Sequence, residues 1–113
     1  MTNTCIFCDI AFGKMPAEIT KDTDTIVVFK DIKPKAPVHL LIVPKKHVQS
    51  IAELADEDRG LVSDMIYVAK DMASSNGLMG YRLAFNVGRE GGQLVDHLHL
   101  HLLGGWKEST NNE

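Results

Sequence analysis

Three histidines near the C-terminus alternate with leucines, and their type and spacing could do chemistry. The run reads His97-Leu98-His99-Leu100-His101. Successive side chains of a strand point to opposite faces, so the imidazoles are expected to share one face and the leucines the other. Near neutral pH an imidazole serves as a nucleophile, a general acid or base, or a metal ligand. The row therefore predicts a reactive site on a strand whose other face packs into the core.

The two cysteines form a second group that could do chemistry. Cys5 and Cys8 are the only cysteines, in a Cys-x-x-Cys pair. In a reducing compartment such a pair is more typical of metal binding or redox chemistry than of a structural disulfide. With His47 and one histidine of the row, the pair could complete a four-ligand zinc site. The alternative is that both cysteines are small apolar residues buried on a short helix.

Glycine pairs flank the histidine row on both sides. Gly91-Gly92 precedes it and Gly104-Gly105 follows it. The first pair allows the backbone to approach a ligand closely and to direct N–H groups at an anion. The second pair permits a sharp exit from the strand.

Hydrophobic patterning predicts the elements that must position these residues. A long helix is expected over 56–75, because apolar residues recur at three- and four-residue spacing. Its apolar face, predicted to be core, comprises Leu61, Val62, Met65, Ile66, Ala69, Met72 and Ala73. A short helix is expected over 5–12. Strands are expected over 18–21, 25–29, 39–43, 81–87 and 95–103. The fold class is therefore α+β, with a five-stranded antiparallel sheet, one long helix and one short helix.

Length and composition predict one small domain. The chain has 113 residues with 12 Lys plus Arg and 15 Asp plus Glu, so its net charge is 12 − 15 = −3. We expect one domain over 1–113 with a polar, mobile tail over 107–113. The mild acidity argues against a nucleic-acid partner. The longest apolar run, 40–43, is too short to span a membrane, and no signal peptide is visible, so a cytoplasmic location is expected.

The segment from Gly91 to Gly105, GGQLVDHLHLHLLGG, resembles the signature of the histidine-triad (HIT) family. Its Leu-Gly-Gly ending is similar to the Hint branch, whereas the Fhit branch usually has Pro-Arg there. Five further segments also match the Hint pattern: Ile6-Phe7, Phe29-x-Asp31-Ile32, Pro34-x-Ala36-Pro37-x-His39, Ile42-Val43-Pro44-Lys45-Lys46-His47, and Tyr81-Arg82 leading to Asn86. The resemblance extends from Cys5 to about Trp106.

This resemblance implies hydrolysis or transfer of a nucleoside monophosphate group. Typical Hint substrates are purine nucleoside phosphoramidates and aminoacyl adenylates. The middle histidine, His99, would attack the α-phosphorus and form a covalent nucleotidyl-imidazole that water resolves. His101 would contact the phosphate and assist proton transfer, and His39 would orient the other histidines. His97 would belong both to the triad and to the metal site.

The resemblance also implies a nucleotide pocket. Asp31 would bind the ribose hydroxyls, and Asn86 with the backbone near Gly92 and Gln93 would contact the phosphate. The apolar slot for the base would comprise Ile6, Phe7, Ile10, Phe29 and Ile32. The alternatives are that Asp31 only forms a turn and that the apolar residues are ordinary core.

A structural zinc site and a homodimer follow from the same resemblance. The zinc ligands would be Cys5, Cys8, His47 and His97, as in some HIT relatives and the related galactose-1-phosphate uridylyltransferases. No catalytic cofactor is expected. Relatives in the Hint branch are homodimers, with the long helix and a strand at an interface that continues the sheet across two subunits.

Two departures from the Hint pattern affect the leaving-group side. Leu94 stands where many Hint members have a serine, and Asp96 replaces a usual aromatic residue. Three other functions remain open at this point. They are hydrolysis of dinucleoside polyphosphates, a nucleotide-binding interaction module with incidental catalysis, and a catalytic metal held by the three histidines.

Overall fold

The computed structural model describes residues 5–107, which form an α+β fold. The helices are α1 (Ile6–Ala11) and α2 (Arg59–Ser75), and the strands are β1 (Ile19–Asp22), β2 (Ile26–Lys30), β3 (Val38–Pro44), β4 (Tyr81–Ala84) and β5 (Leu100–Gly104). Single 3-10 turns span Ile51–Glu53, Asp56–Asp58 and Arg89–Gly91. The tail predicted to be mobile spans 107–113, and its residues from 108 onward lie outside the described part.

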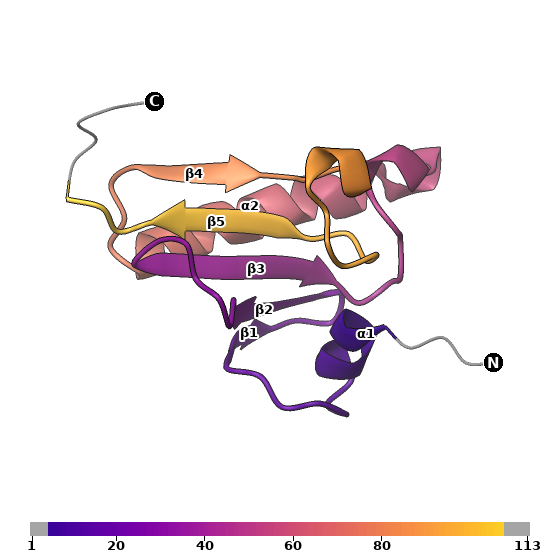
Figure 1. Ribbon diagram of the computed structural model, residues 1–113, viewed down its shortest axis with the longest axis horizontal. Helices are drawn as coiled ribbons and strands as arrows, with labels where there is room; N and C mark the ends of the chain where they lie inside the picture. The colour runs from indigo at the N-terminus through magenta and orange to yellow at the C-terminus, as the bar shows by residue number, and fades with distance from the viewer. Residues whose placement is uncertain (1–4, 108–113) are drawn as a thin grey trace.

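The five strands form one sheet in the order β1-β2-β3-β5-β4, with every neighbouring pair antiparallel. In Figure 1, α2 runs along one face of this sheet, and α1 lies beside the end that carries β1 and β2. The predicted fold class is thus confirmed. Among the described residues, no helix combines the length and the apolar character that crossing a membrane requires.

The central strands are buried on both faces, which explains their uninterrupted apolar sequences. On one face, Val28 and Ile42 join Met65 and Ala69 of α2 in the larger core cluster. On the other face, Val27, Phe29, Leu41 and Val43 pack with Phe7, Ile10 and Ala11 of α1. The sheet therefore separates a core under α2 from a smaller core under α1.

The strand that carries the histidines is shorter than predicted. Strand β5 begins only at Leu100, so His97 and His99 precede it. The ladder cannot extend further back because Leu98 N–H donates to Val48 O and His97 N–H donates to Val95 O. The predicted alternation nevertheless holds, since Leu98, Leu100 and Leu102 all pack in the core under α2.

Other predicted boundaries also shift. Strand β4 ends at Ala84 rather than Val87, and β3 continues through Pro44, which pairs with Ile26. Residues 56–58 form a 3-10 turn, so α2 begins at Arg59. Ile66, predicted to lie in the core, is 43% exposed. The apolar stripe of α2 is therefore narrower than its sequence suggested.

Candidate active site and metal centre

The ring of His99 is held so that one nitrogen stays available. Its Nδ1 lies 2.7 Å from the carbonyl oxygen of His97, and because a carbonyl only accepts, Nδ1 must carry the proton. The neutral ring therefore has its lone pair on Nε2. The residue is 7% exposed, so the backbone contact fixes the tautomer in a largely water-excluded setting. This is the state that an imidazole nucleophile requires.

A second chain of hydrogen bonds fixes His39 and His101. Lys35 N–H donates to His39 Nδ1 at 3.0 Å, so the proton of neutral His39 lies on Nε2. That proton is donated to His101 Nδ1 at 2.9 Å, which leaves the neutral His101 ring with its own proton on Nε2. The Asp31 carboxylate lies 3.5 Å from His39 Nε2. His101 thus presents a hydrogen-bond donor, while His99 presents a lone pair.

Burial keeps these three imidazoles neutral. It lowers the pKa of His39 and of His99, and it lowers the pKa of His101 to about 4, with His99 and His39 adding smaller effects in the same direction. All three rings are therefore uncharged at pH 7, as the hydrogen-bond pattern requires. An uncharged ring keeps the lone pair that attack on phosphorus needs.

We expect acid to destabilise the protein through His101. Its pKa falls from 6.5 to about 4 on folding, so between these values the unfolded chain binds a proton that the folded protein excludes. The free energy of unfolding is therefore at its full value above pH 6.5 and decreases as the pH falls toward 4. Within this window one such histidine adds up to about 1.4 kcal/mol per pH unit to the slope of the unfolding free energy. Urea titrations of the wild type and of His101→Gln at several pH values measure the slope. Equal slopes for the two proteins would contradict this origin.

Four side chains meet on the side of the site next to α1. The thiol sulfur of Cys5 lies 3.2 Å from His97 Nδ1, and that of Cys8 lies 3.5 Å from the same nitrogen and 3.3 Å from His47 Nδ1. One ligand atom from each of the four lies within 4.8 Å of the others. His97 Nε2 donates to Pro44 O at 2.7 Å, so its lone pair on Nδ1 faces the two sulfurs. The structure thus brings together the four predicted metal ligands.

Three of the distances between ligand atoms in this cluster, 3.2, 3.3 and 3.5 Å, are close to those around a tetrahedral zinc ion. Metal–ligand bonds of about 2.0–2.3 Å at tetrahedral angles place neighbouring ligand atoms roughly 3.3–3.8 Å apart. Two thiols with two imidazoles form a common donor set of structural zinc sites. Burial and the neighbouring Cys5 raise the pKa of Cys8 to about 11, a shift that a bound cation would reverse. A metal held by four protein ligands would have no open position and would crosslink α1 to the loop before β5.

The residues predicted to bind the base of a nucleotide differ in how deeply they are buried. Ile32 is 87% exposed and Ile6 is 42% exposed, so both side chains are accessible at the surface. Phe7, Ile10 and Phe29 are buried in the core under α1. Of the five residues predicted to line the slot for the base, two are therefore accessible and three belong to the core.

Asp31 lies at the edge of the histidine cluster. Its Oδ1 accepts from Lys33 N–H at 2.8 Å, which is the turn geometry considered as an alternative. Its Oδ2 lies 3.5 Å from His39 Nε2. The carboxylate therefore both forms a turn and borders the site.

The glycine-rich loop before the triad is closed by its own hydrogen bonds. The Gln93 side chain, 2% exposed, donates to Gln49 O and Val95 O and accepts from Gly88 N–H. The backbone N–H groups of Gly92 and Gln93 donate to Arg89 O and Gly88 O. Gln93 is thus an anchor of the loop.

Two other residues of this loop explain features that the sequence left open. Asn86 Nδ2 donates to Gly91 O at 2.9 Å. Arg89 donates to Gln93 O and pairs with Asp96 at 3.1 Å, so Asp96 serves the loop in place of the usual aromatic residue. Leu94 is 81% exposed at the surface of the loop. The anchoring role of Arg89 was missed because an isolated arginine in a glycine-rich turn carries no specific signal.

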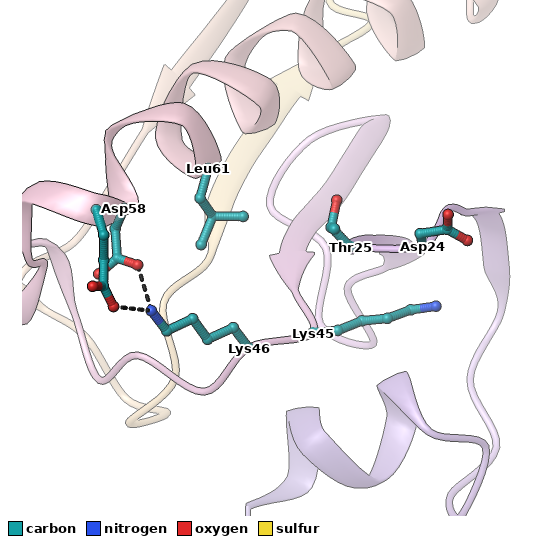
Figure 2. A pocket seen from close by; sticks show the side chains of 7 residues that line it. Asp24, Thr25, Lys45, Lys46, Asp58 and Leu61 are labelled. Atoms are coloured by element: carbon teal, nitrogen blue, oxygen red, sulfur yellow. Dashed lines mark hydrogen bonds and ion pairs between the residues drawn. The ribbon is translucent and has the colours of Figure 1, made fainter.

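A cavity of about 400 Å³ lies away from the histidines, between the turn before β2 and the start of α2 (Figure 2). Its lysines are already paired: Lys46 contacts Asp58 and Glu57, and Lys45 contacts Asp22 at 2.6 Å. Asp58 also accepts from Ala55 N–H ahead of α2. These contacts tie the end of β3 to the start of α2.

Known proteins are similar to this chain in both sequence and fold. A family model described as "Scavenger mRNA decapping enzyme C-term binding" matches residues 4–112. Protein HitA of Neisseria gonorrhoeae is 42% identical over 103 residues, which cover 90% of this chain and 96% of HitA. A HIT family hydrolase from Legionella pneumophila Philadelphia 1 superposes with a TM-score of 0.91 at 48% identity, covering 95% of this chain and 97% of that one.

A further solved structure is relevant to the metal centre. A Zn-bound histidine triad family protein from Mycobacterium smegmatis is 27% identical, with a TM-score of 0.83, and the match covers 95% of this chain and 78% of that protein. Together with the triad geometry, the family match over nearly the whole chain and these identities show that the chain belongs to the histidine-triad (HIT) family.

Proposed function

We propose that the protein is a Hint-like nucleotidyl hydrolase or transferase that acts on purine nucleoside 5′-phosphoramidates or aminoacyl adenylates. One observation carries this proposal: the His97 carbonyl holds the proton of His99 on Nδ1, which frees Nε2 for attack. The rings of His99 and His101 have their centroids 4.9 Å apart, so a phosphoryl group near Nε2 of His99 is also near the donor of His101.

In the first step the lone pair of His99 Nε2 forms a bond to the α-phosphorus. The phosphorus–nitrogen bond of a phosphoramidate breaks, and its electron pair leaves with the amine nitrogen, which takes a proton from solvent. The imidazole becomes a nucleotidyl-imidazolium that keeps its proton on Nδ1, where the His97 carbonyl stabilises the new positive charge. Splitting the displacement in two lowers each barrier.

In the second step water attacks the same phosphorus and the phosphorus–Nε2 bond breaks. The electron pair returns to His99, the nucleoside monophosphate leaves, and the proton of the water passes to solvent. His101, held by His39, donates a hydrogen bond from Nε2–H to a phosphoryl oxygen in both steps. The nucleotide is bound by Asp31 at the ribose and by Ile6 and Ile32 at the base, with Asn86 next to the phosphate. The N–H groups of Gly92 and Gln93, which already donate within their loop, are assigned no phosphate contact.

The substrate class is tested by comparing two leaving groups on the same nucleotide. The protein is expected to release AMP faster from adenosine 5′-phosphoramidate than from a diadenosine polyphosphate. A preference for the polyphosphate would support the Fhit-like alternative instead. Binding of AMP with no turnover of either compound would show that the protein is a nucleotide-binding module instead of an enzyme acting on these substrates. Activity of Cys8→Ser, which lacks the four-ligand cluster, that a chelator leaves unchanged would exclude a catalytic metal on the three histidines.

We also propose that the four-ligand cluster binds a structural zinc ion. The support is the donor set, the spacing of its atoms and the orientation of the His97 ring. When bound, zinc would supply a crosslink between α1 and the loop that leads into β5, and it would take no part in the transfer steps.

A homodimer through the β4 edge is part of the proposal. Strand β4 pairs only with β5, and Tyr81 and Leu83 on it are 40% and 37% exposed. Leu83 pairs with Leu102 and so lies on the sheet face that α2 covers. Helix α2 itself exposes Ile66 and Tyr67. The exposed apolar strip that Tyr81 and Leu83 form on this unpaired edge favours pairing with a second copy of the chain.

We therefore expect Leu83→Lys to weaken the dimer. A charge on this strip would lie opposite apolar surface of the partner, which should raise the dissociation constant by about 100-fold or more. Sedimentation velocity at micromolar concentration measures the change, with Lys21→Ala on the opposite edge strand as the control. A wild-type protein that sediments as a monomer would contradict the dimer itself.

A further inference from the structure

The metal-ligand cluster and the proposed nucleophile share a residue. His97 offers its Nδ1 to the two sulfurs, its Nε2–H to Pro44 O, and its own carbonyl to His99 Nδ1 at 2.7 Å. Its side chain is fully buried. Whatever restrains the His97 ring therefore restrains the carbonyl that sets the tautomer of His99.

A second physical link runs through helix α1. Phe7 lies between the two cysteines in sequence, and its ring meets the His99 ring in a T-shaped arrangement, with centroids 5.0 Å apart and planes at 89°. The same ring packs against His97 at 6.1 Å and against Phe29 at 5.3 Å. Phe7 is only 7% exposed, so its ring offers little open surface to a ligand and instead supports the proposed nucleophile from within the core.

Helix α1 is held by this cluster and by the core on which its buried side chains pack. It has six residues, far fewer than an isolated helix needs for stability in water. Its buried side chains are Phe7, Ile10 and Ala11, and Cys5 caps its first turn by accepting from Cys8 N–H. Cys5 is thus the N-terminal cap of the helix, and the two cysteines together attach the helix to His47 and His97.

We propose that Phe7 is a positioning residue for the His99 ring, and that the four-ligand cluster acts on the nucleophile through Phe7 and through His97. The inference rests on the proposed role of His99 as the nucleophile. With the cluster closed, the Phe7 ring and the His97 carbonyl leave the imidazole one orientation. With the cluster open, α1 loosens and the ring gains other orientations, although residues that bind the nucleotide, such as Asp31 and Ile32, remain in place.

The first test separates positioning from nucleotide binding. Phe7→Leu and, as a second variant, Phe7→Met keep most of the apolar volume but remove the aromatic ring that contacts His99. We expect the single-turnover rate of adduct formation to fall by about 10- to 100-fold, while the dissociation constant for AMP stays within about 2-fold. Phe12→Leu is the matched control, because Phe12 follows the same helix and is 62% exposed.

The second test follows the His99 ring itself. In ¹⁵N-labelled protein the Nδ1–H signal of His99 should be sharp in the zinc-loaded wild type. It should broaden after chelation and in Cys8→Ser, and added zinc should restore it in the wild type only. The adduct-forming rate should change in parallel. Metal analysis should show that Phe7→Leu still binds zinc.

Three outcomes overturn the inference, and they can be told apart from failure of the proposed function. A rise in the AMP dissociation constant that accounts for the whole loss in Phe7→Leu would make Phe7 part of the base slot. An unchanged rate in both Phe7 variants would remove its role altogether. An unchanged His99 signal and rate after chelation would make the cluster a crosslink alone. If His99→Ala still forms the adduct, the proposed function itself fails.

Discussion

Replacing His99 by alanine is expected to abolish the covalent nucleotide adduct and to lower turnover of adenosine 5′-phosphoramidate by about 10⁴-fold or more. The substitution removes the triad nitrogen that is unprotonated and accepts no hydrogen bond, and the other two histidines of the triad cannot replace it. His101 has its lone pair occupied by His39, and that of His97 faces two sulfurs. Steady-state kinetics with the purified variant measure the loss.

Two further measurements on the same variant make the result interpretable. Its thermal unfolding should stay cooperative, and it should still bind AMP, because the residues proposed to bind the ribose and base are unchanged. Turnover close to that of the wild type, with the fold intact, would show that the transfer does not pass through His99.

Removing the proposed zinc ion is expected to lower the midpoint of thermal unfolding by roughly 10 °C, which corresponds to a loss of about 3 kcal/mol in a domain of this size. Without the metal, α1 retains only three buried side chains, and the thiol of Cys8 and the ring of His97 lose their common partner. The experiment compares protein as purified with protein treated with a strong chelator, and adds zinc back.

The Cys5→Ser, Cys8→Ser double variant is the control for this experiment. It should melt near the chelated wild type, and the chelator should not change it further. The account of the cluster would be contradicted by purified protein with less than about one zinc per four chains and with both thiols freely titratable.

The alternation of histidine and leucine was enough to predict which side chains share a face. Leu98, Leu100 and Leu102 lie together under α2, as the period of two requires. It was not enough to predict the strand, because strand assignment depends on partners. Leu98 N–H bonds to Val48 O, outside the sheet, so β5 starts at Leu100 while the side chains still alternate.

The ligand set and the triad could be named from residue types, but not the groups that orient them. The carbonyls of Pro44 and His97 and the N–H of Lys35 fix three imidazole tautomers. Every residue except proline carries both of these backbone groups, so no sequence pattern marks the ones that a fold will use.

The exposure of Ile66 was missed because helical spacing shows which side chains share a face but not how much of that face the sheet covers.

The most direct test of the central claim is to trap the reaction midway and locate the nucleotide. The protein is mixed with a purine nucleoside 5′-phosphoramidate, quenched within one turnover under conditions that preserve phosphorus–nitrogen bonds, and digested for peptide mass spectrometry. The account predicts a nucleoside monophosphate adduct on the peptide that contains the triad, assigned to His99. An adduct on another residue, or steady turnover with no adduct at any quench time, would contradict it.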